Sequence, residues 1–263
     1  MKTRVITTDR VKLGIKGLDP LIGGGVSRGS VILLPGCVGS GKTIMSLQFI
    51  ARGAMDHDER GLFVSFEQHE DRLREQALQF GWDIEKLEAL GMVRIMRMSK
   101  LTIGQVLADL EKAIHSFKPH RLAIDSFTFM ALSAHTRERL VDIDKIPSDE
   151  LLYGEPKHLN QTTPLEWNSI VVKKMVTDLV LMLQQKGITT ILTSEVSKNS
   201  DWYSRDTVSE FACDGVLSLK ATSIGSETQR TIEVVKMRNT KISGGIYDFE
   251  FTPQGMKVLS QNK

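Results

Sequence analysis

The sequence lacks several features that would place it in a specialised class of protein. Its 263 residues include two cysteines, Cys37 and Cys213, which is too few for a disulfide scaffold. No apolar run approaches the ~18–20 residues that span a bilayer, and the first residues lack the apolar stretch of a secretory signal. No internal repeat is present, which argues against solenoids and propellers. We therefore expect a cytoplasmic protein with reduced thiols and no membrane partner.

The sequence also lacks an excess of charge of one sign. Lys and Arg number 34 and Asp and Glu number 32, giving a formal net charge of +2. Binding to nucleic acid through its phosphates requires a clustered excess of positive charge. The balance therefore predicts that nucleic acid is not a partner.

Short apolar runs alternate with helical patterns through most of the chain, which predicts an α/β fold. A strand–helix alternation of this kind forms a mostly parallel sheet covered by helices on both faces. Closer alternation near the end of the chain predicts antiparallel strands. We interpret residues 1–263 as a single domain. Strands are expected at 30–36, 61–66, 92–98, 120–127 and 188–196, helices at 41–55, 70–80, 102–117 and 171–187, and antiparallel strands at 214–221, 231–238 and 247–251.

One segment, 133–168, interrupts this alternation. It is polar, contains three prolines and lies between an expected strand and the helix that follows it. Connections of this length are unusual in compact domains and are either functional or disordered. We treat 133–168 as an insertion that could recruit an unknown protein partner.

Residues 36–43 match the phosphate-loop pattern GxxxxGK[ST] in full. The match follows an expected strand and opens an expected helix, which is the context that the pattern requires. Glycines let backbone N–H groups surround phosphates at a helix N-terminus, the lysine contacts the β- and γ-phosphates, and the threonine hydroxyl ligates Mg²⁺. The sequence thus predicts ATP and Mg²⁺ as ligands. The residues expected to bind the nucleotide are Gly36, Val38, Gly39, Ser40, Gly41, Lys42, Thr43 and Ile44, with Lys42 also catalytic.

Polar residues follow three of the other expected strands. Asp125 ends the run Leu-Ala-Ile and should face the ligand crevice, so we expect Asp125 and Thr43 to hold the metal. Glu67 directly follows the strand at 61–66 and is the candidate for orienting the attacking water. Thr193 and Ser194 end the run ITTILTS at 188–194. They either report the γ-phosphate through a hydroxyl or simply cap the strand end.

Several segments together resemble the KaiC-like branch of the RecA superfamily of ATPases. The lead-in GLDPLIGGG at 17–25, followed by Arg-Gly-Ser at 28–30, looks like that family's approach to its phosphate loop. The stretch FVSFEQHEDRLREQALQFGWD at 63–83 is similar to its catalytic-glutamate turn. Lys-Met-Arg at 236–238 and FEFT at 249–252 resemble its K-x-R segment and closing strand. The resemblance covers nearly all of the chain except 133–168.

The resemblance implies a RecA-type fold, assembled as a homo-oligomeric ring that is usually a hexamer, with ATP bound between subunits. By position, Glu67 would activate water, and Lys236 and Arg238 would reach the γ-phosphate of the neighbouring subunit. On the residues alone, Lys236 and Arg238 would simply be an exposed face of an edge strand.

The sequence also departs from the family pattern. Gln68 replaces the second residue of the usual Glu-Glu pair, and Asn239 and Ile242 replace a glycine and a histidine of the clock proteins' K-x-R segment. The clock proteins' autophosphorylated Ser-Thr pair falls at Glu210-Phe211. Because no hydroxyl is available there, we do not expect autokinase activity.

These observations favour a slow ATPase whose sites lie between subunits and drive assembly or partner regulation. Two alternatives remain open: an ATP-binding signalling or scaffold module with little hydrolysis, and a RecA-type motor stimulated by nucleic acid. The loop 197–210 carries Trp202 and Tyr203, which could stack on bases, but its charge is net negative. Cys37, inside the phosphate loop, is either a redox-sensitive thiol or a small residue that fits the turn.

Overall fold

A nine-stranded sheet forms the centre of the protein. The computed structural model describes residues 9–98, 103–128, 130, 170–197, 202–204, 206–225 and 227–259. Across the sheet the strand order is β11-β10-β9-β8-β3-β7-β6-β4-β5. The strands are β3 (Val31–Gly36), β4 (Gly61–Ser65), β5 (Val93–Arg97), β6 (Arg121–Asp125), β7 (Thr189–Glu195), β8 (Gly215–Ile224), β9 (Glu227–Met237), β10 (Ile246–Thr252) and β11 (Gly255–Val258).

The sheet is parallel in one part and antiparallel in the other. β8, β3, β7, β6, β4 and β5 are parallel neighbours, whereas β8–β9, β9–β10 and β10–β11 pair antiparallel. Every residue of β3, β4 and β6 is buried, as expected for strands covered on both faces. The predicted fold class, α/β with antiparallel C-terminal strands, is confirmed.

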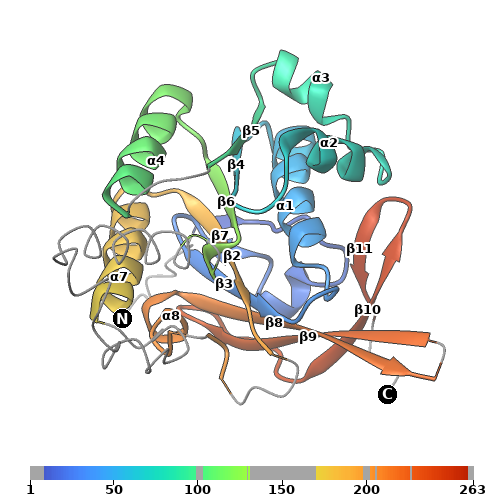
Figure 1. Ribbon diagram of the computed structural model, residues 1–263. Coiled ribbons are helices and arrows are strands. Elements are labelled where there is room, and N and C mark those ends of the chain that lie inside the picture. Colours follow the sequence, from blue (N-terminus) through green and yellow to red (C-terminus); the bar gives the residue numbers. More distant parts are fainter. Residues whose placement is uncertain are drawn as a thin grey trace, which may run out of the picture.

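Helices cover both faces of the sheet (Figure 1). On one side, α1 (Lys42–His57), α2 (Glu70–Leu78) and α3 (Ile84–Ala89) enclose one core cluster. On the other, α4 (Ile103–Phe117) and α7 (Ile170–Gln185) enclose a second. Alternate residues of β3 belong to the two clusters: Ile32 to the first and Leu33 to the second. This two-sided burial fixes β3, and with it the start of the phosphate loop, at the middle of the molecule.

Short elements were not anticipated from the sequence. Two- to six-residue elements give no readable periodicity, because hydrophobic patterns need several turns or alternations to be recognised. The insertion expected at 133–168 lies outside the described residues. The additional elements are β1 (Arg10–Val11), η1 (Asp19–Ile22), β2 (Val26–Ser27), α3, α8 (Ser209–Ala212) and β11.

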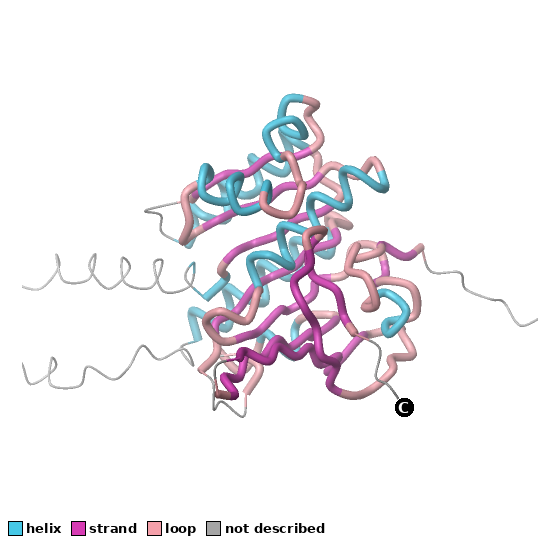
Figure 2. Tube along the Cα trace, turned by 90° about the vertical axis from the view of Figure 1, so that its right-hand side faces the viewer, coloured by secondary structure: helices cyan, strands magenta, loops and turns pink. Residues whose placement is uncertain are grey.

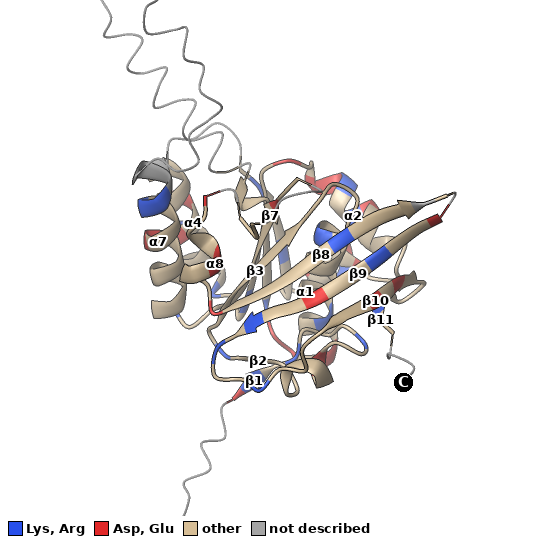
Figure 3. Ribbon diagram, turned by 90° about the horizontal axis from the view of Figure 1, so that it is seen from below, with Lys and Arg blue, Asp and Glu red and all other residues tan. Residues whose placement is uncertain are grey.

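The tube in Figure 2 follows the strands as one continuous layer, with helices packed along it. β8 and β9 form a long ribbon that extends past the other elements in Figure 3, where Lys and Arg are interspersed with Asp and Glu among the other residues. Among the helices that the structure describes, none is long and apolar enough to cross a membrane.

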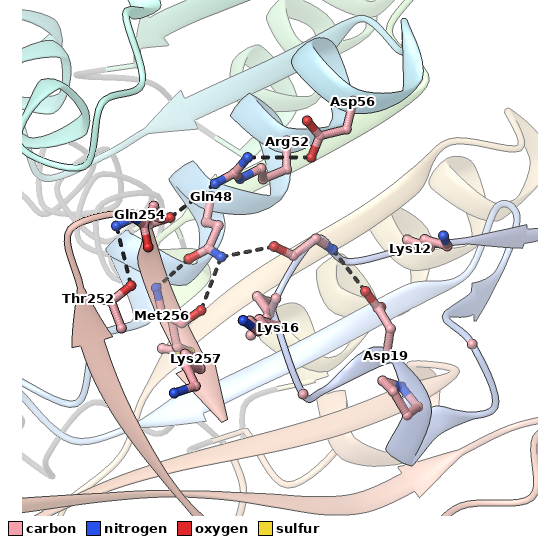
Figure 4. A pocket seen from close by; sticks show the side chains of 15 residues that line it. Lys12, Lys16, Asp19, Gln48, Arg52, Asp56, Thr252, Gln254, Met256 and Lys257 are labelled. Carbon is pink, nitrogen blue, oxygen red and sulfur yellow. Dashed lines mark hydrogen bonds and ion pairs between the residues drawn. The ribbon is translucent and has the colours of Figure 1, made fainter. Parts of the chain in front are cut away.

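The lead-in to β3 is held against α1 and the last hairpin by Gln48. Its side-chain amide donates to the carbonyls of Gly14 (2.9 Å) and Met256 (3.2 Å) and accepts from the Met256 N–H (2.6 Å). Asp19 fixes the preceding turn by accepting from the N–H of Leu13 (2.7 Å). These contacts wall a groove of about 610 Å³ along α1 (Figure 4). The groove is separate from the phosphate loop, none of whose residues lines it.

We expect Gln48→Met to lower the free energy of unfolding by about 2–4 kcal/mol, because it keeps the side-chain volume but leaves three backbone groups, of Gly14 and Met256, without this partner. Chemical denaturation measures this loss. Gln229, whose exposed amide contacts Asp248, supplies the control: Gln229→Met should change stability by less than about 0.5 kcal/mol. Equal effects of the two substitutions would contradict the role assigned to Gln48.

Candidate nucleotide site

The phosphate loop joins the C-terminal end of β3 to the N-terminus of α1. Gly39 and Gly41 have φ angles of 76° and 99°, which disfavour residues with a Cβ. Gly36 has a different requirement, since a Cβ there would lie 2.4 Å from the Ser40 hydroxyl and 2.8 Å from the Leu219 carbonyl. The first turn of α1 leaves its backbone N–H groups without helical acceptors. The loop therefore presents N–H donors at a helix N-terminus, which suits a phosphate.

Lys42, the first residue of α1, folds back over the loop. Its ammonium donates to the carbonyls of Gly36 and Cys37, each at 3.0 Å, and forms an ion pair with Glu195 at 3.1 Å. The side chain is 7% exposed. The structure thus places a buried positive charge at the centre of the loop.

Thr43 and Asp125 meet across the gap between α1 and β6. The Thr43 hydroxyl donates to one Asp125 carboxylate oxygen at 2.7 Å, and the Thr193 hydroxyl, from β7, donates to the other at 2.6 Å. Burial is the main cause that raises the pKa of Asp125, while the two hydroxyl bonds and the nearby Lys42 act in the opposite direction. The carboxylate is therefore held in an environment where an additional positive charge would stabilise its ionised form.

Glu67 lies just beyond the end of β4, in a turn fixed by the neighbouring residues. The Ser65 hydroxyl accepts from the Gln68 N–H (3.0 Å) and donates to the Gln68 carbonyl (2.8 Å). The Ser126 hydroxyl donates to the Glu67 carboxylate. The residue as a whole is exposed, but its carboxyl is partly enclosed. This loss of hydration, together with the negative charges of Asp125 and Glu195, raises the pKa of Glu67.

The residues present fit a magnesium ion bound together with a nucleotide. Thr43 and Asp125 offer hard oxygen ligands that already lie within hydrogen-bond distance of each other, and Mg²⁺ prefers one or two protein oxygens completed by phosphate and water. Among the described residues, no group of three or more His, Cys, Asp or Glu side chains is arranged to hold a metal alone. A metal at Thr43 and Asp125 would therefore depend on the nucleotide.

Lys236 and Arg238 do not reach the phosphate loop of their own chain. The register places Lys236 opposite Val216, which is level with Leu33, toward the far end of β3 from the loop. The Lys236 ammonium donates to the carbonyls that end α8, among them that of Cys213 at 2.7 Å. Arg238 is exposed and donates to the Phe211 carbonyl at 2.9 Å. Within one chain, these two side chains therefore lie apart from the phosphate loop.

Thr193 and Ser194 are both buried, and neither simply caps a strand end. Thr193 bonds Asp125, and the Ser194 hydroxyl lies 3.2 Å from that of Thr128. Cys37 is also buried, with its thiol 3.8 Å from the Ala221 carbonyl. Whether its thiol responds to oxidation stays a prediction.

An aromatic cluster lies beside the loop, and the sequence did not predict it, although 80–82 and 249–251 are parts of the family motifs. Phe251 packs so close to Gly41 that a Cβ there would lie 2.7 Å from its ring. The guanidinium of Arg230 lies 5.2 Å from the centre of the Phe251 ring and donates to the Gly39 carbonyl at 3.4 Å. Phe80 lies 6.2 Å from Phe251 between ring centres. No local signal joins residues so distant in sequence.

A model of the KaiC ATPase family matches residues 11–145 and 160–263. The chain belongs to the KaiC ATPase family. The resemblance inferred from the sequence is thereby confirmed. The break in the match, 146–159, falls inside the segment 133–168.

The similar KaiC-family chains include single-domain proteins and proteins about twice as long. UPF0273 protein MJ1359 of Methanocaldococcus jannaschii is 31% identical over 95% of this chain and 96% of its own length. The circadian clock oscillator protein KaiC of Synechococcus elongatus is also 31% identical over 95% of this chain, but only 44% of the clock protein is covered. A KaiC-like protein, PH0186, from Pyrococcus horikoshii has a solved structure that superposes with a TM-score of 0.75 at 30% identity, covering 96% of this chain and all of the other.

The raised pKa of Asp125 predicts that the ionised form of this carboxyl lowers the stability of the KaiC-family protein. A carboxyl with a raised pKa in the folded state favours folding at low pH, and this contribution is lost as the pH rises through the raised value. Asp125→Asn should therefore stabilise the nucleotide-free protein more at pH 8 than at pH 5. Thermal unfolding at the two pH values measures the difference. Asp178→Asn, at an exposed pair with Lys174, is the control; a lower stability of Asp125→Asn at both pH values would contradict the prediction.

Proposed function

We propose that this protein is a slow ATPase whose sites are completed between subunits of a ring, where nucleotide occupancy controls assembly or a partner. The observation that carries the proposal is the convergence of Lys42, Thr43, Asp125 and Glu67, which come from three different segments and meet at the C-terminal ends of β3, β4 and β6. This is the arrangement that phosphoryl transfer to water needs, namely positioned charge and a base. Membership in the KaiC ATPase family supports the same chemistry.

In the proposed reaction, water attacks the γ-phosphorus of ATP and the bond to the ADP oxygen breaks. Lys42 and the loop N–H groups hold the phosphates and stabilise the developing negative charge. Mg²⁺, when bound at Thr43 and Asp125, supplies further neutralisation of that charge. Glu67 orients the water and accepts its proton, then releases it to solvent. A carboxylate with a raised pKa is a better proton acceptor than an ordinary one, which favours this assignment.

The half-buried rings of Phe80 and Phe251 extend the site beyond the phosphates. Both lie beside the loop, and flat aromatic surfaces suit the base of a nucleotide. We assign the base to this side of the loop.

Lys236 and Arg238 complete the site in trans in this proposal. They lie toward the end of the sheet opposite to the phosphate loop of the same chain. One copy can therefore present them to the loop of the next copy in a head-to-tail ring. A hexamer is the ring size that the family resemblance implies. The interspersed charges in Figure 3 favour this protein interface over a nucleic-acid motor.

Glu67→Gln should lower the turnover of ATP by about 10²–10⁴-fold, because the neutral amide cannot accept a proton. The affinity for ATP should change by less than about threefold, since Lys42 and the loop are intact. Steady-state phosphate release and equilibrium binding measure the two effects.

The matched control is Glu75→Gln, at an exposed carboxyl of α2, which should leave turnover unchanged. Normal hydrolysis by Glu67→Gln would refute the base assignment. If the wild-type protein binds ATP without turnover, the scaffold alternative holds instead, and stimulation of turnover by single-stranded DNA would favour the motor.

Completion in trans predicts that two inactive variants restore each other. Arg238→Ala should lose about 10³-fold or more of its activity, as expected for an arginine finger. When it is co-expressed with Glu67→Gln and mixed assemblies are purified through two tags, an equal mixture should recover about one quarter of wild-type turnover, the chance that an intact Glu67 faces an intact Arg238 in a head-to-tail ring. Mixed assemblies without recovered activity would contradict the arrangement.

A further inference from the structure

Glu195 places a third carboxylate beside the phosphate loop, and the proposed mechanism does not use it. It is the last residue of β7, and the register places it beside Gly36, where the loop begins. Its carboxylate lies 3.1 Å from the Lys42 ammonium. The Glu195 side chain is 30% exposed, whereas that of Lys42 is 7% exposed.

The Lys42 ammonium has three N–H donors, and the structure supplies three acceptors for them: two loop carbonyls and the Glu195 carboxylate. A phosphate that binds Lys42 must displace one of the three. The carbonyls of Gly36 and Cys37 belong to the loop backbone and cannot withdraw without opening the loop. The carboxylate, on a flexible side chain that reaches solvent, is the acceptor that can leave.

The backbone around Glu195 is held by hydrogen bonds, whereas its side chain pairs with Lys42 and is partly exposed to solvent. Its N–H donates to the Thr128 hydroxyl at 2.9 Å, and the N–H of Val196 donates to the Gly36 carbonyl at 3.2 Å. An exchange of the carboxylate for a phosphate is thus a rotation of one side chain. The negative charge of Glu195 also acts on Glu67 and Asp125, so a carboxylate that stayed in place would repel an incoming γ-phosphate.

We propose that Glu195 is an internal competitor of the γ-phosphate, pairing with Lys42 in the empty and ADP-bound protein and giving way when ATP binds. The inference rests on the proposed function of the loop and adds a residue that sets the preference between ATP and ADP. The β-phosphate of ADP is held chiefly by the N–H groups of the loop, so ADP can bind while the Lys42 ammonium keeps its bond to Glu195. ATP takes that donor and breaks the ion pair, and its affinity is lowered by the energy of the lost pair.

Glu195→Gln tests the proposal, because it keeps the shape of the side chain and removes its charge. The affinity for a non-hydrolysable ATP analogue with Mg²⁺ should rise about tenfold, the change that 1.4 kcal/mol produces. The affinity for ADP with Mg²⁺ should change by less than about threefold. Titration calorimetry on the full chain measures both. Glu250→Gln removes the carboxylate of another Glu–Lys pair, with Lys257 at 3.2 Å, and should change neither affinity.

The ratio of the two affinities is the decisive readout, since a merely structural role of Glu195 would alter both alike. Equal tightening for the two nucleotides, or unchanged or weaker binding of the ATP analogue, would overturn the inference. Glu195→Asp provides a second variant that keeps the charge and should shift the ratio less than Glu195→Gln. Failure of the wild-type protein to bind either nucleotide would instead contradict the proposed function, so the two failures are distinguishable.

Discussion

The buried ammonium of Lys42 is the charge on which the rest of the site depends. A charged lysine side chain that is only 7% exposed is costly unless acceptors surround its ammonium, and the two loop carbonyls and Glu195 meet that requirement. The loop closes around this charge, and the carboxylates of Asp125 and Glu67 lie near enough for Lys42 to lower their pKa values. Without it, three carboxylates would face one another at the end of the sheet. The Lys42 ammonium therefore stabilises the empty site, and it is also the group that a phosphate would bind.

The parallel sheet is what brings these groups together. β3, β4, β6 and β7 are adjacent and run in the same direction, so their C-terminal ends, and the polar residues that follow them, meet at one edge. Burial of β3 between two core clusters prevents the loop from shifting relative to Asp125. The antiparallel strands β9 to β11 add the aromatic wall beside the loop, with Phe251 against Gly41. The geometry of the site is thus a direct consequence of strand order.

The same sheet separates two kinds of charge. The loop and its carboxylates lie at one end of β3, while Lys236 and Arg238 lie toward the other, bound to the carbonyls that end α8. In the function proposed above, a single chain holds both halves of the site, but it holds them apart. The KaiC ATPase family includes both single-domain and longer relatives of this chain. Because the two groups lie apart within one chain, a site that used both would form between two domains or two chains.

The sequence by itself determined the phosphate loop, the α/β class and the family, because each is encoded in local spacing: GxxxxGK[ST], runs of buried residues, and motifs such as those at 17–25 and 63–83. It also identified Asp125 and Glu67 as strand-end carboxylates. Only the tertiary structure decided which groups touch. The Thr193 hydroxyl on Asp125, the Glu195 carboxylate on Lys42 and the packing of Phe251 against Gly41 join residues 68 to 210 positions apart. Such contacts depend on the order and register of strands, and no local pattern of residues records these.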